Sequence, residues 1–165
     1  MAQIPQMVLE SQGDDVVDSN VPRSEDDPPK MESASECDYA HQELSCTIIG
    51  ACMRVHRTMG PGFPESVYQA AVQLELTKSG IKVIREHCYS VEYLGTLVGR
   101  FRVDFVVEGA IICEFKAVES LIDQHKAQLL SYLKASGLEL GLLINFGHTS
   151  LQYKRIINTR ANKNP

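Results

Sequence analysis

The chain has 165 residues, 44% of them hydrophobic, and a formal net charge of −5 at pH 7. Its five cysteines are odd in number and form no CxxC pair, which argues against a disulfide framework, a zinc site and an iron–sulfur cluster. No apolar run approaches the roughly 20 residues of a membrane span, and the N-terminus lacks the basic and apolar regions of a secretory signal. A soluble, cytoplasmic protein with no membrane partner is therefore expected.

The N-terminal segment differs in composition from the rest of the chain. Residues 1–40 hold ten acidic side chains against Arg23 and Lys30, a net charge of −8, so residues 41–165 carry +3. Residues 1–38 contain four prolines and no aromatic residue, so they cannot bury enough apolar surface to offset the entropy lost on ordering. We predict a disordered acidic tail over residues 1–38 and one folded domain over residues 39–165. The tail either competes with a negatively charged ligand or only aids solubility.

Two amphipathic helices are expected at the start of the domain. Apolar residues recur at helical spacing between about Tyr39 and Met59, and the Gly-Pro-Gly-Phe-Pro sequence at 60–64 ends this pattern. Pro64 suits the first position of a second helix, which Ser79-Gly80 would end. We expect the apolar face of this second helix to comprise Val67, Ala70, Ala71, Leu74 and Leu76.

Three strands are expected next. The segment from Ile81 to Tyr93 is rich in β-branched and aromatic residues, and the segment from Phe101 to Val118 predicts two strands joined by a turn at Glu108-Gly109. Strand alternation predicts one face formed by Phe101, Val103, Phe105 and Val107, and another formed by Arg102, Asp104 and Val106.

The turn length decides which side chains meet across this hairpin. If the turn takes three residues, Val107 faces Ile111 and Asp104 lies opposite Glu114, with β-carbons about 5 Å apart. Two carboxylates and the ammonium of Lys116 would then converge on an otherwise apolar patch of sheet. Like charges at this distance are unfavourable unless a cation lies between them, and a divalent metal ion fits that description. The simpler alternative is a surface ladder of ion pairs, which contributes about 1 kcal/mol or less.

A third helix and two further strands complete the pattern. Residues from Glu119 to Ser136 predict a helix that ends at Gly137, and its packing face would comprise Leu121, Ile122, Leu129, Leu130 and Leu133. The apolar run from Leu140 to Phe146 is typical of a strand buried on both faces, and a last strand follows from Leu151 to Ile157. We therefore predict an α/β fold in which helices flank a mixed central sheet. Four basic residues either contact phosphates or form a solvated face: Lys154, Arg155, Arg160 and Lys163.

The hairpin pattern, an Asp followed ten residues later by Glu-x-Lys, resembles the PD-(D/E)xK nuclease superfamily. Further segments occur in the same order: Gly-Phe-Pro-Glu-Ser-Val-Tyr at 62–68, Arg85-Glu86, Gln-Leu-Leu-Ser-Tyr-Leu at 128–133 and Leu-Ile-Asn-Phe-Gly at 143–147. Over roughly residues 40–157 the chain resembles the small GxxExxY proteins, a branch of that superfamily. The resemblance implies a restriction-endonuclease-like core.

The resemblance also implies a function: metal-dependent hydrolysis of phosphodiester bonds in nucleic acid, with DNA favoured over RNA. In this interpretation Asp104, Glu114 and Glu65 bind Mg²⁺ or Mn²⁺, and Lys116 and Gln128 complete the catalytic site. The residues alone leave alternatives open, since Glu65 could only compensate a helix dipole and Gln128 could be a surface amide. Position 86 is either a solvated edge glutamate or a support of the site.

Two questions about function stay open at this point. A lysine between carboxylates keeps its charge, so Lys116 is expected to stabilise negative charge rather than to act as a general base. A nuclease-like fold that only binds nucleic acid or protein is the main alternative to an active nuclease, and the sequence leaves a homodimer open. An enzyme acting on small molecules has no support, because the chain has neither a Gly-rich phosphate loop nor a recognisable Ser/His/Asp or Cys/His arrangement.

Overall fold

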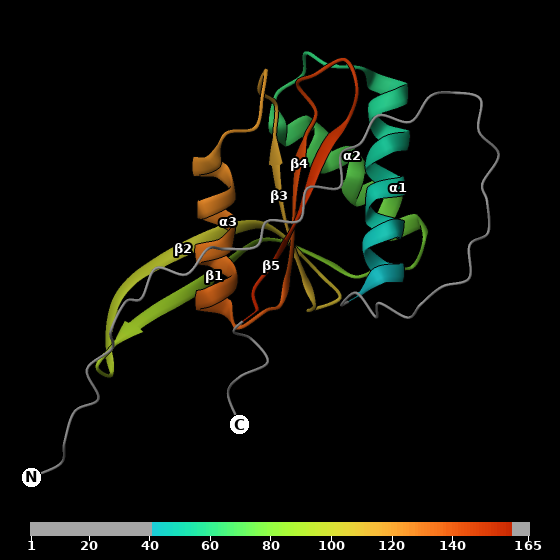
Figure 1. Cartoon of the computed structure of the whole chain (residues 1–165). Helices are drawn as coiled ribbons and strands as arrows, with labels where there is room; N and C mark the ends of the chain where they lie inside the picture. Colours follow the sequence, from blue (N-terminus) through green and yellow to red (C-terminus); the bar gives the residue numbers. More distant parts are fainter. Residues whose placement is uncertain (1–40, 160–165) are drawn as a thin grey trace, which may run out of the picture.

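The computed structural model describes residues 41–159, which form three helices and five strands (Figure 1). In chain order these are α1 (Gln42–Met59), α2 (Glu65–Lys78), β1 (Val83–Tyr93), β2 (Thr96–Val107), β3 (Ile111–Lys116), α3 (Asp123–Ser136), β4 (Leu140–Asn145) and β5 (Gln152–Ile157). The expected order of elements is confirmed. The expected acidic tail, Arg160 and Lys163 lie outside the described residues. None of the helices within 41–159 is long and apolar enough to cross a membrane.

The five strands form one mixed sheet in the order β1-β2-β3-β4-β5. All neighbouring strands are antiparallel except β3 and β4, which run parallel. A parallel pair needs a crossover connection, and α3 supplies it. Figure 1 shows α1 and α2 on one side of the sheet and α3 on the other. The predicted mixed sheet flanked by helices is therefore confirmed.

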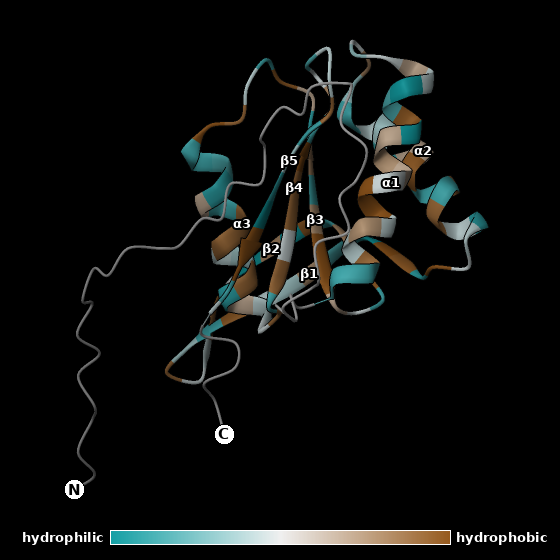
Figure 2. Ribbon diagram, turned by 45° about the vertical axis from the view of Figure 1, so that its right-hand side comes forward, coloured by the Kyte–Doolittle hydropathy of each residue, from teal (hydrophilic) through white to brown (hydrophobic). Residues whose placement is uncertain are grey.

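Each face of the sheet has its own hydrophobic core, and Figure 2 shows hydrophobic residues, in brown, along the central strands and on the helices beside them. The core under α1 and α2 includes Ile48, Cys52, Tyr68, Val72, Leu76, Phe105, Cys113, Phe115, Ile144 and Phe146. The core under α3 comprises Val103, Val106, Ile112, Leu129, Leu133, Leu143 and Ile156. The helix α3 lies close to β4, because a β-carbon added at Gly141 would come within 2.9 Å of Leu129.

The expected alternation along β2 is wrong before Phe105. Phe105 and Val107 pack under α1 and α2 as expected, but Val103 belongs to the core under α3 and Phe101 packs against it. The ladder between β1 and β2 has no pair at Glu86 and Asp104, and Glu86 has a φ of 50°, in the left-handed region. The hairpin therefore bends at Glu86 and Asp104. The bend changes which side chains of β2 face α1 and α2 and which face α3.

The expected buried face of α2 is wrong in part, since Ala71 and Leu76 pack into the core as expected and the other members do not. Side chains that the spacing placed inside are exposed, among them Val67, Ala70 and Leu74, while the buried positions are Tyr68, Gln69, Val72 and Leu76. A tyrosine can be buried when its hydroxyl finds hydrogen-bond partners. Here Tyr68 Oη donates to the Gly60 carbonyl at 2.7 Å and accepts from Phe63 N at 3.1 Å.

The third helix begins at Asp123 rather than at Glu119. The segment before it is held by Asn145, whose side chain accepts from Val118 N at 3.0 Å and donates to Val118 O at 2.8 Å. This contact keeps the chain beside β4 before the helix starts. As a result Ile122 is 49% exposed and does not pack as expected.

The basic residues of β5 are less exposed than predicted. Lys154 and Arg155 are both half-buried, and Arg155 donates a hydrogen bond to the hydroxyl of Ser45 on α1. The interpretation of these two residues as a freely solvated face is therefore wrong.

Candidate active site

The candidate site lies where β2 separates from β3, a place that we call the fork. These two strands pair over only three positions, from Phe105–Cys113 to Val107–Ile111, and the second pair confirms the three-residue turn. Continued by one position, this register sets Asp104 opposite Glu114, as expected. Beyond the fork β3 pairs with β4 alone, as far as Lys116.

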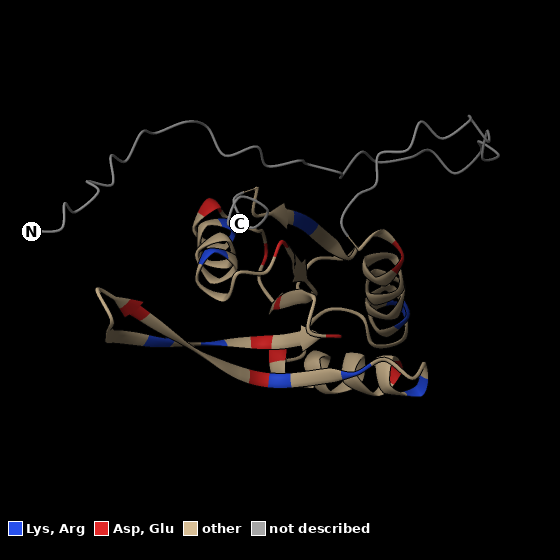
Figure 3. Ribbon diagram, turned by 90° about the horizontal axis from the view of Figure 1, so that it is seen from below, with Lys and Arg blue, Asp and Glu red and all other residues tan. Residues whose placement is uncertain are grey.

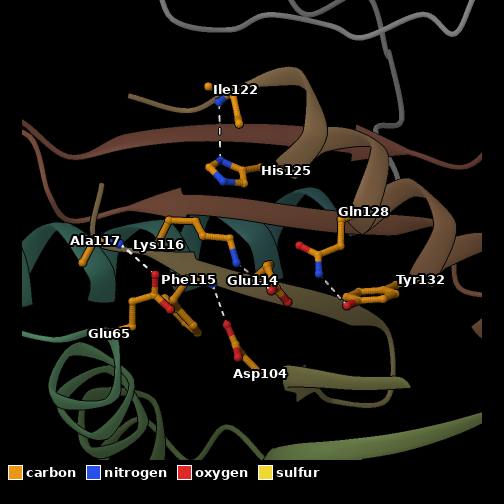
Figure 4. Close-up of polar contacts among 10 residues, drawn as sticks. All are labelled: Glu65, Asp104, Glu114, Phe115, Lys116, Ala117, Ile122, His125, Gln128 and Tyr132. Carbon is orange, nitrogen blue, oxygen red and sulfur yellow. Dashed lines mark hydrogen bonds and ion pairs between the residues drawn. The ribbon is translucent and has the colours of Figure 1, made fainter. Parts of the chain in front are cut away.

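Three side chains from other elements accept hydrogen bonds from backbone N–H groups at the end of β3. The carboxylates, shown in Figure 4, come from β2 and from the start of α2. The amide comes from the end of β4. The pairs are Phe115 N with Asp104 Oδ2 at 2.8 Å, Ala117 N with Glu65 Oε1 at 3.2 Å, and Val118 N with Asn145 Oδ1 at 3.0 Å. Each predicted acidic residue except Glu114 therefore has a defined backbone partner.

The fourth polar group of the fork is a nearly buried ion pair. Lys116 Nζ lies 2.9 Å from Glu114 Oε1, and the two side chains are 15% and 8% exposed. The other carboxylate oxygen, Glu114 Oε2, is buried and has no hydrogen-bond partner among the described residues. A buried carboxylate oxygen without a partner loses its hydration without compensation.

Burial and mutual charge shift the ionisation of these groups. Burial raises the pKa of Asp104, although hydrogen bonding from Phe115 N and the charge of Lys116 oppose the change. Burial and the charge of Asp104 raise the pKa of Glu114, against the hydrogen bond from Lys116. Burial alone would lower the pKa of Lys116, but its hydrogen bond to Glu114 and the nearby carboxylates raise it overall. The lysine is therefore an ammonium at neutral pH.

The α3 helix closes the site from the other side. A cavity of about 460 Å³ is lined by Glu65, Lys116, Val118, Gln124, His125 and Gln128, and we call it the fork cavity. Gln128 Nε2 donates to Tyr132 Oη at 2.7 Å, while His125 Nδ1 accepts from Ile122 N at 3.4 Å. The structure therefore brings Gln128 to the cavity that Glu65 and Lys116 line, whereas His125 is hydrogen-bonded to its own helix start.

The Gly-x-x-Glu-x-x-Tyr spacing has a local explanation. Gly62 has a φ of 114°, a conformation that other residues rarely adopt, and it lies three residues before the start of α2 at Glu65. Tyr68 is fully buried and stacks on Phe146 with ring centroids 4.5 Å apart, while its hydroxyl holds the loop before the helix. The glycine and the tyrosine thus fix the loop from which Glu65 reaches the end of β3.

Two residues at the site were missed by the sequence interpretation. Asn145 is fully buried and bonds with Val118 and Gly147, and a polar residue ending an apolar strand was the available signal. Gln69 hydrogen-bonds Asp104 and accepts from Arg85 at 3.4 Å. It lies four residues after Glu65 and therefore on the same face of α2, which was its signal.

Glu86 lies opposite Asp104 in the β1–β2 hairpin, but its side chain pairs with a residue outside the fork. Its side chain is 59% exposed and forms an ion pair at 3.8 Å with Arg102 on the neighbouring strand. Figure 3 shows that the β1–β2 hairpin carries both acidic and basic residues along its length. The interpretation of Glu86 as a solvated edge residue is therefore the one the structure favours.

The donor set at the fork fits a hard divalent cation, although it is not a complete ligand cage. No group of three or more His, Cys, Asp or Glu within residues 41–159 is arranged to hold a metal ion. Asp104 and Glu114 nevertheless offer oxygen atoms that are partly desolvated, including the unpartnered Glu114 Oε2. Mg²⁺ commonly uses only one or two carboxylates and fills its remaining positions with water and substrate.

Comparison with known proteins identifies the family of the chain. Residues 42–156 match the family model described as the PD-(D/E)XK nuclease superfamily. No curated protein matches the chain. The crystal structure of SSO0001 aligns with a TM-score of 0.47 and 20% identity, and the aligned part covers 56% of this chain and 49% of that one, about half its length. On the family match, the chain belongs to the PD-(D/E)XK nuclease superfamily, and its mixed sheet is the restriction-endonuclease-like core.

Proposed function

We propose that this protein is a divalent-metal-dependent nuclease of the GxxExxY branch that hydrolyses phosphodiester bonds, with DNA preferred over RNA. The observation that carries the proposal is the fork itself. Two carboxylates and a lysine share a largely buried place, and one carboxylate oxygen has no partner among the described residues. Such a site is unfavourable when empty and is stabilised by a cation. Superfamily membership supports the same chemistry.

In this proposal Asp104 and Glu114 hold the metal, Mg²⁺ or Mn²⁺, and Glu65 supports it from the start of α2. When bound, the ion would polarise a phosphoryl oxygen and lower the pKa of the attacking water. Lys116 remains an ammonium and stabilises the negative charge that develops on the phosphate, because the carboxylates raise its pKa. Gln128 faces the same cavity and orients the substrate or the water by hydrogen bonding.

A specific observation favours a second candidate, a nuclease-like fold that binds nucleic acid or protein without cutting. Glu65 does not join Asp104 and Glu114 in a group arranged to hold a metal ion, within residues 41–159. Its carboxylate is instead engaged with Ala117 N at 3.2 Å. In this candidate Glu65 keeps that backbone contact, and only Asp104 and Glu114 remain as carboxylates near one another for a metal ion.

The test uses the full 165-residue chain with single-stranded and duplex DNA and with RNA, in the presence of Mg²⁺, Mn²⁺ or EDTA. We expect metal-dependent cleavage, reduced at least about 100-fold in Glu114→Gln and in Lys116→Ala, a loss typical of removing a group that stabilises the transition state. Glu75→Gln is the matched control, because this partly exposed glutamate pairs with Arg54 away from the fork.

Thermal unfolding of the same proteins separates the two candidate functions. A metal that binds only the folded state raises the unfolding temperature, so Mn²⁺ should stabilise the wild type more than Glu114→Gln. If the folded Glu114→Gln variant cleaves nucleic acid at the wild-type rate, the proposed site is overturned. Binding of nucleic acid without cleavage by the wild type, in any of the metals, would favour the binding module.

A further inference from the structure

A second cavity adjoins the fork cavity and is not used by the proposed chemistry. It has a volume of about 320 Å³, and its lining residues are Gly62, Phe63, Ala117, Val118, Glu119, Gly147, His148 and Thr149. Val118 lines both cavities, so the two lie side by side along the segment that links β3 to α3. We call the second one the loop cavity, because two loops form its walls.

Both walls are fixed by hydrogen bonds and close packing. On one side, Tyr68 holds the loop at 60–63 through Gly60 O and Phe63 N. On the other side, a β-carbon added at Gly147 would lie 2.4 Å from Val118 O, so this loop rests directly on the backbone of the linking segment. His56 Nε2 also lies 2.9 Å from His148 O. The loop cavity is therefore preformed, which lowers the entropy lost when a ligand binds.

The lining groups have the chemistry of a base-binding pocket. The side chain of Phe63 is 46% exposed, and its ring meets Tyr68 edge-on at 81°, so this contact leaves a ring face of Phe63 uncovered. The backbone N–H of Ser150 donates to His148 Nδ1 at 3.4 Å, so the neutral ring carries its proton on Nε2, which has no partner among the described residues. Glu119 also lines the cavity and is exposed, so its carboxylate is available as an acceptor.

The same lining argues against a phosphate as the occupant. No lysine or arginine within residues 41–159 lines the loop cavity, while Glu119 places a negative charge there. A nucleobase is uncharged, stacks on an aromatic ring whatever its sequence, and carries groups that can pair with Glu119 and His148. Amino groups of cytosine, adenine or guanine would donate to the carboxylate.

We propose that the loop cavity binds one unpaired nucleobase beside the reacting phosphate, stacked on Phe63 and hydrogen-bonded through its amino group to Glu119. The proposal rests on the nuclease function proposed for the fork, because it makes the base part of that substrate. A base inside a duplex cannot reach such a pocket without leaving its stack. The protein should therefore prefer single strands, or duplexes with an unpaired base, over fully paired ones.

Binding of a single-stranded DNA oligonucleotide that carries one 2-aminopurine, measured with the full chain in EDTA, tests the pocket without cleavage. Stacking on Phe63 should quench the fluorescence of this base analogue. We expect Phe63→Leu to bind about tenfold more weakly and to lose the quenching, because base–aromatic stacking is worth roughly tenfold in affinity or more. Phe63→Tyr keeps the ring and should retain both signals. Leu94→Ala removes an 83% exposed apolar side chain at the hairpin turn and serves as the distant control.

The base preference tests the second contact. Glu119→Gln should lose the preference for an amino-bearing base over thymine at the same position, while keeping the quenching that depends on Phe63. Unchanged affinity and quenching in a folded Phe63→Leu would overturn the proposal, and so would equal binding of the single strand and its full duplex.

The outcome is separable from that of the proposed nuclease. Cleavage by the wild type with no effect of Phe63→Leu would leave the nuclease standing and remove the base pocket. Quenching that depends on Phe63, in a protein that cuts no nucleic acid, would retain the pocket and remove the nuclease.

Discussion

The two edges of β3 differ in which partners their backbone hydrogen-bonding groups have. Along its β4 edge the strand pairs at six successive positions, from Ile111–Leu140 to Lys116–Asn145, and every residue of β4 is buried. Along its β2 edge the pairing stops after three positions. Beyond that point, side-chain oxygens accept hydrogen bonds from the backbone N–H groups. All residues of β4 are apolar or glycine up to its last position, Asn145, whereas two carboxylates, those of Asp104 and Glu65, accept hydrogen bonds where the β2 ladder is missing.

This difference explains why the polar residues of the fork lie where they do. A backbone N–H that loses its strand partner must find another acceptor, and Asp104, Glu65 and Asn145 each supply one. Glu114 is the exception, because its Oε2 serves no backbone group and remains without a partner in the part of the chain described. Substituting a side chain that accepts a hydrogen bond from a backbone N–H group should therefore change stability and activity differently from substituting Glu114, which accepts none.

The largest expected change in stability follows from adding a side-chain atom beside the β4 edge of β3. In Gly147→Ala the new β-carbon would meet backbone atoms of Val118 and Ala117 at 2.4–2.7 Å, and backbone cannot move aside as a flexible side chain can. We expect a loss of about 3 kcal/mol in the free energy of unfolding, at the upper end for overpacking. Urea unfolding measures it, and Gly99→Ala is the control, because nothing lies within 4 Å of the β-carbon added there. Equal stability of the two variants would contradict the close contact.

A somewhat smaller loss should follow from removing the amide that joins the two edges. Asn145→Ala leaves the N–H groups of Val118 and Gly147 without their acceptor, at a position that is fully buried. We expect about 2 kcal/mol of destabilisation, since each unsatisfied buried donor costs about 1 kcal/mol or more. Gln152→Ala removes only one partner of this amide and should cost about 0.5 kcal/mol. A cost for Asn145→Ala as small as that of Gln152→Ala would show that water replaces the amide.

The pH dependence of the stability of the metal-free protein tests how Glu114 differs from the other carboxylates of the fork. Its folded-state pKa is raised above the unfolded value near 4.5, chiefly by burial and then by the charge of Asp104. The folded state therefore takes up the proton first, and stability rises as the pH falls through the folded pKa, with the gain complete below the unfolded pKa. In Glu114→Gln this part of the rise should disappear. Chemical unfolding at several pH values in EDTA measures it, and a parallel pH dependence of the two proteins would refute the raised pKa.

Much of the fold was readable from sequence because its signals are local. The continuous apolar run of β4 and the three-residue turn at Glu108-Gly109 both predicted their elements, and the turn fixed Asp104 opposite Glu114. The signals that failed depend on distant partners. Tyr68 is buried only because Gly60 and Phe63 satisfy its hydroxyl, which no periodicity along α2 reveals.

The candidate site divides in the same way. The spacing of Asp104, Glu114 and Lys116 is set within one hairpin, so the sequence could place them together. Asn145 and Gln69 join the site through tertiary contacts, from the end of β4 and from α2, and their partners are visible only once the sheet is assembled. The bend at Glu86 was unforeseen for another reason, since a glutamate with positive φ carries no sequence signature.

The smallest expected effect comes from a comparison of two ion pairs, one exposed and one nearly buried. Glu86–Arg102 is separated by 3.8 Å with both side chains more than half exposed, whereas Glu114–Lys116 is separated by 2.9 Å and nearly buried. Exposed pairs contribute about 0.5 kcal/mol because water and salt screen them, so Glu86→Gln should change the free energy of unfolding by no more than that and leave cleavage unaltered. Urea unfolding at low and high salt, with a cleavage assay, measures both quantities. A large loss of cleavage in a stable Glu86→Gln would mean that the bend in the hairpin, and not the fork alone, shapes the site, because the β1–β2 ladder has no pair at Glu86 and Asp104.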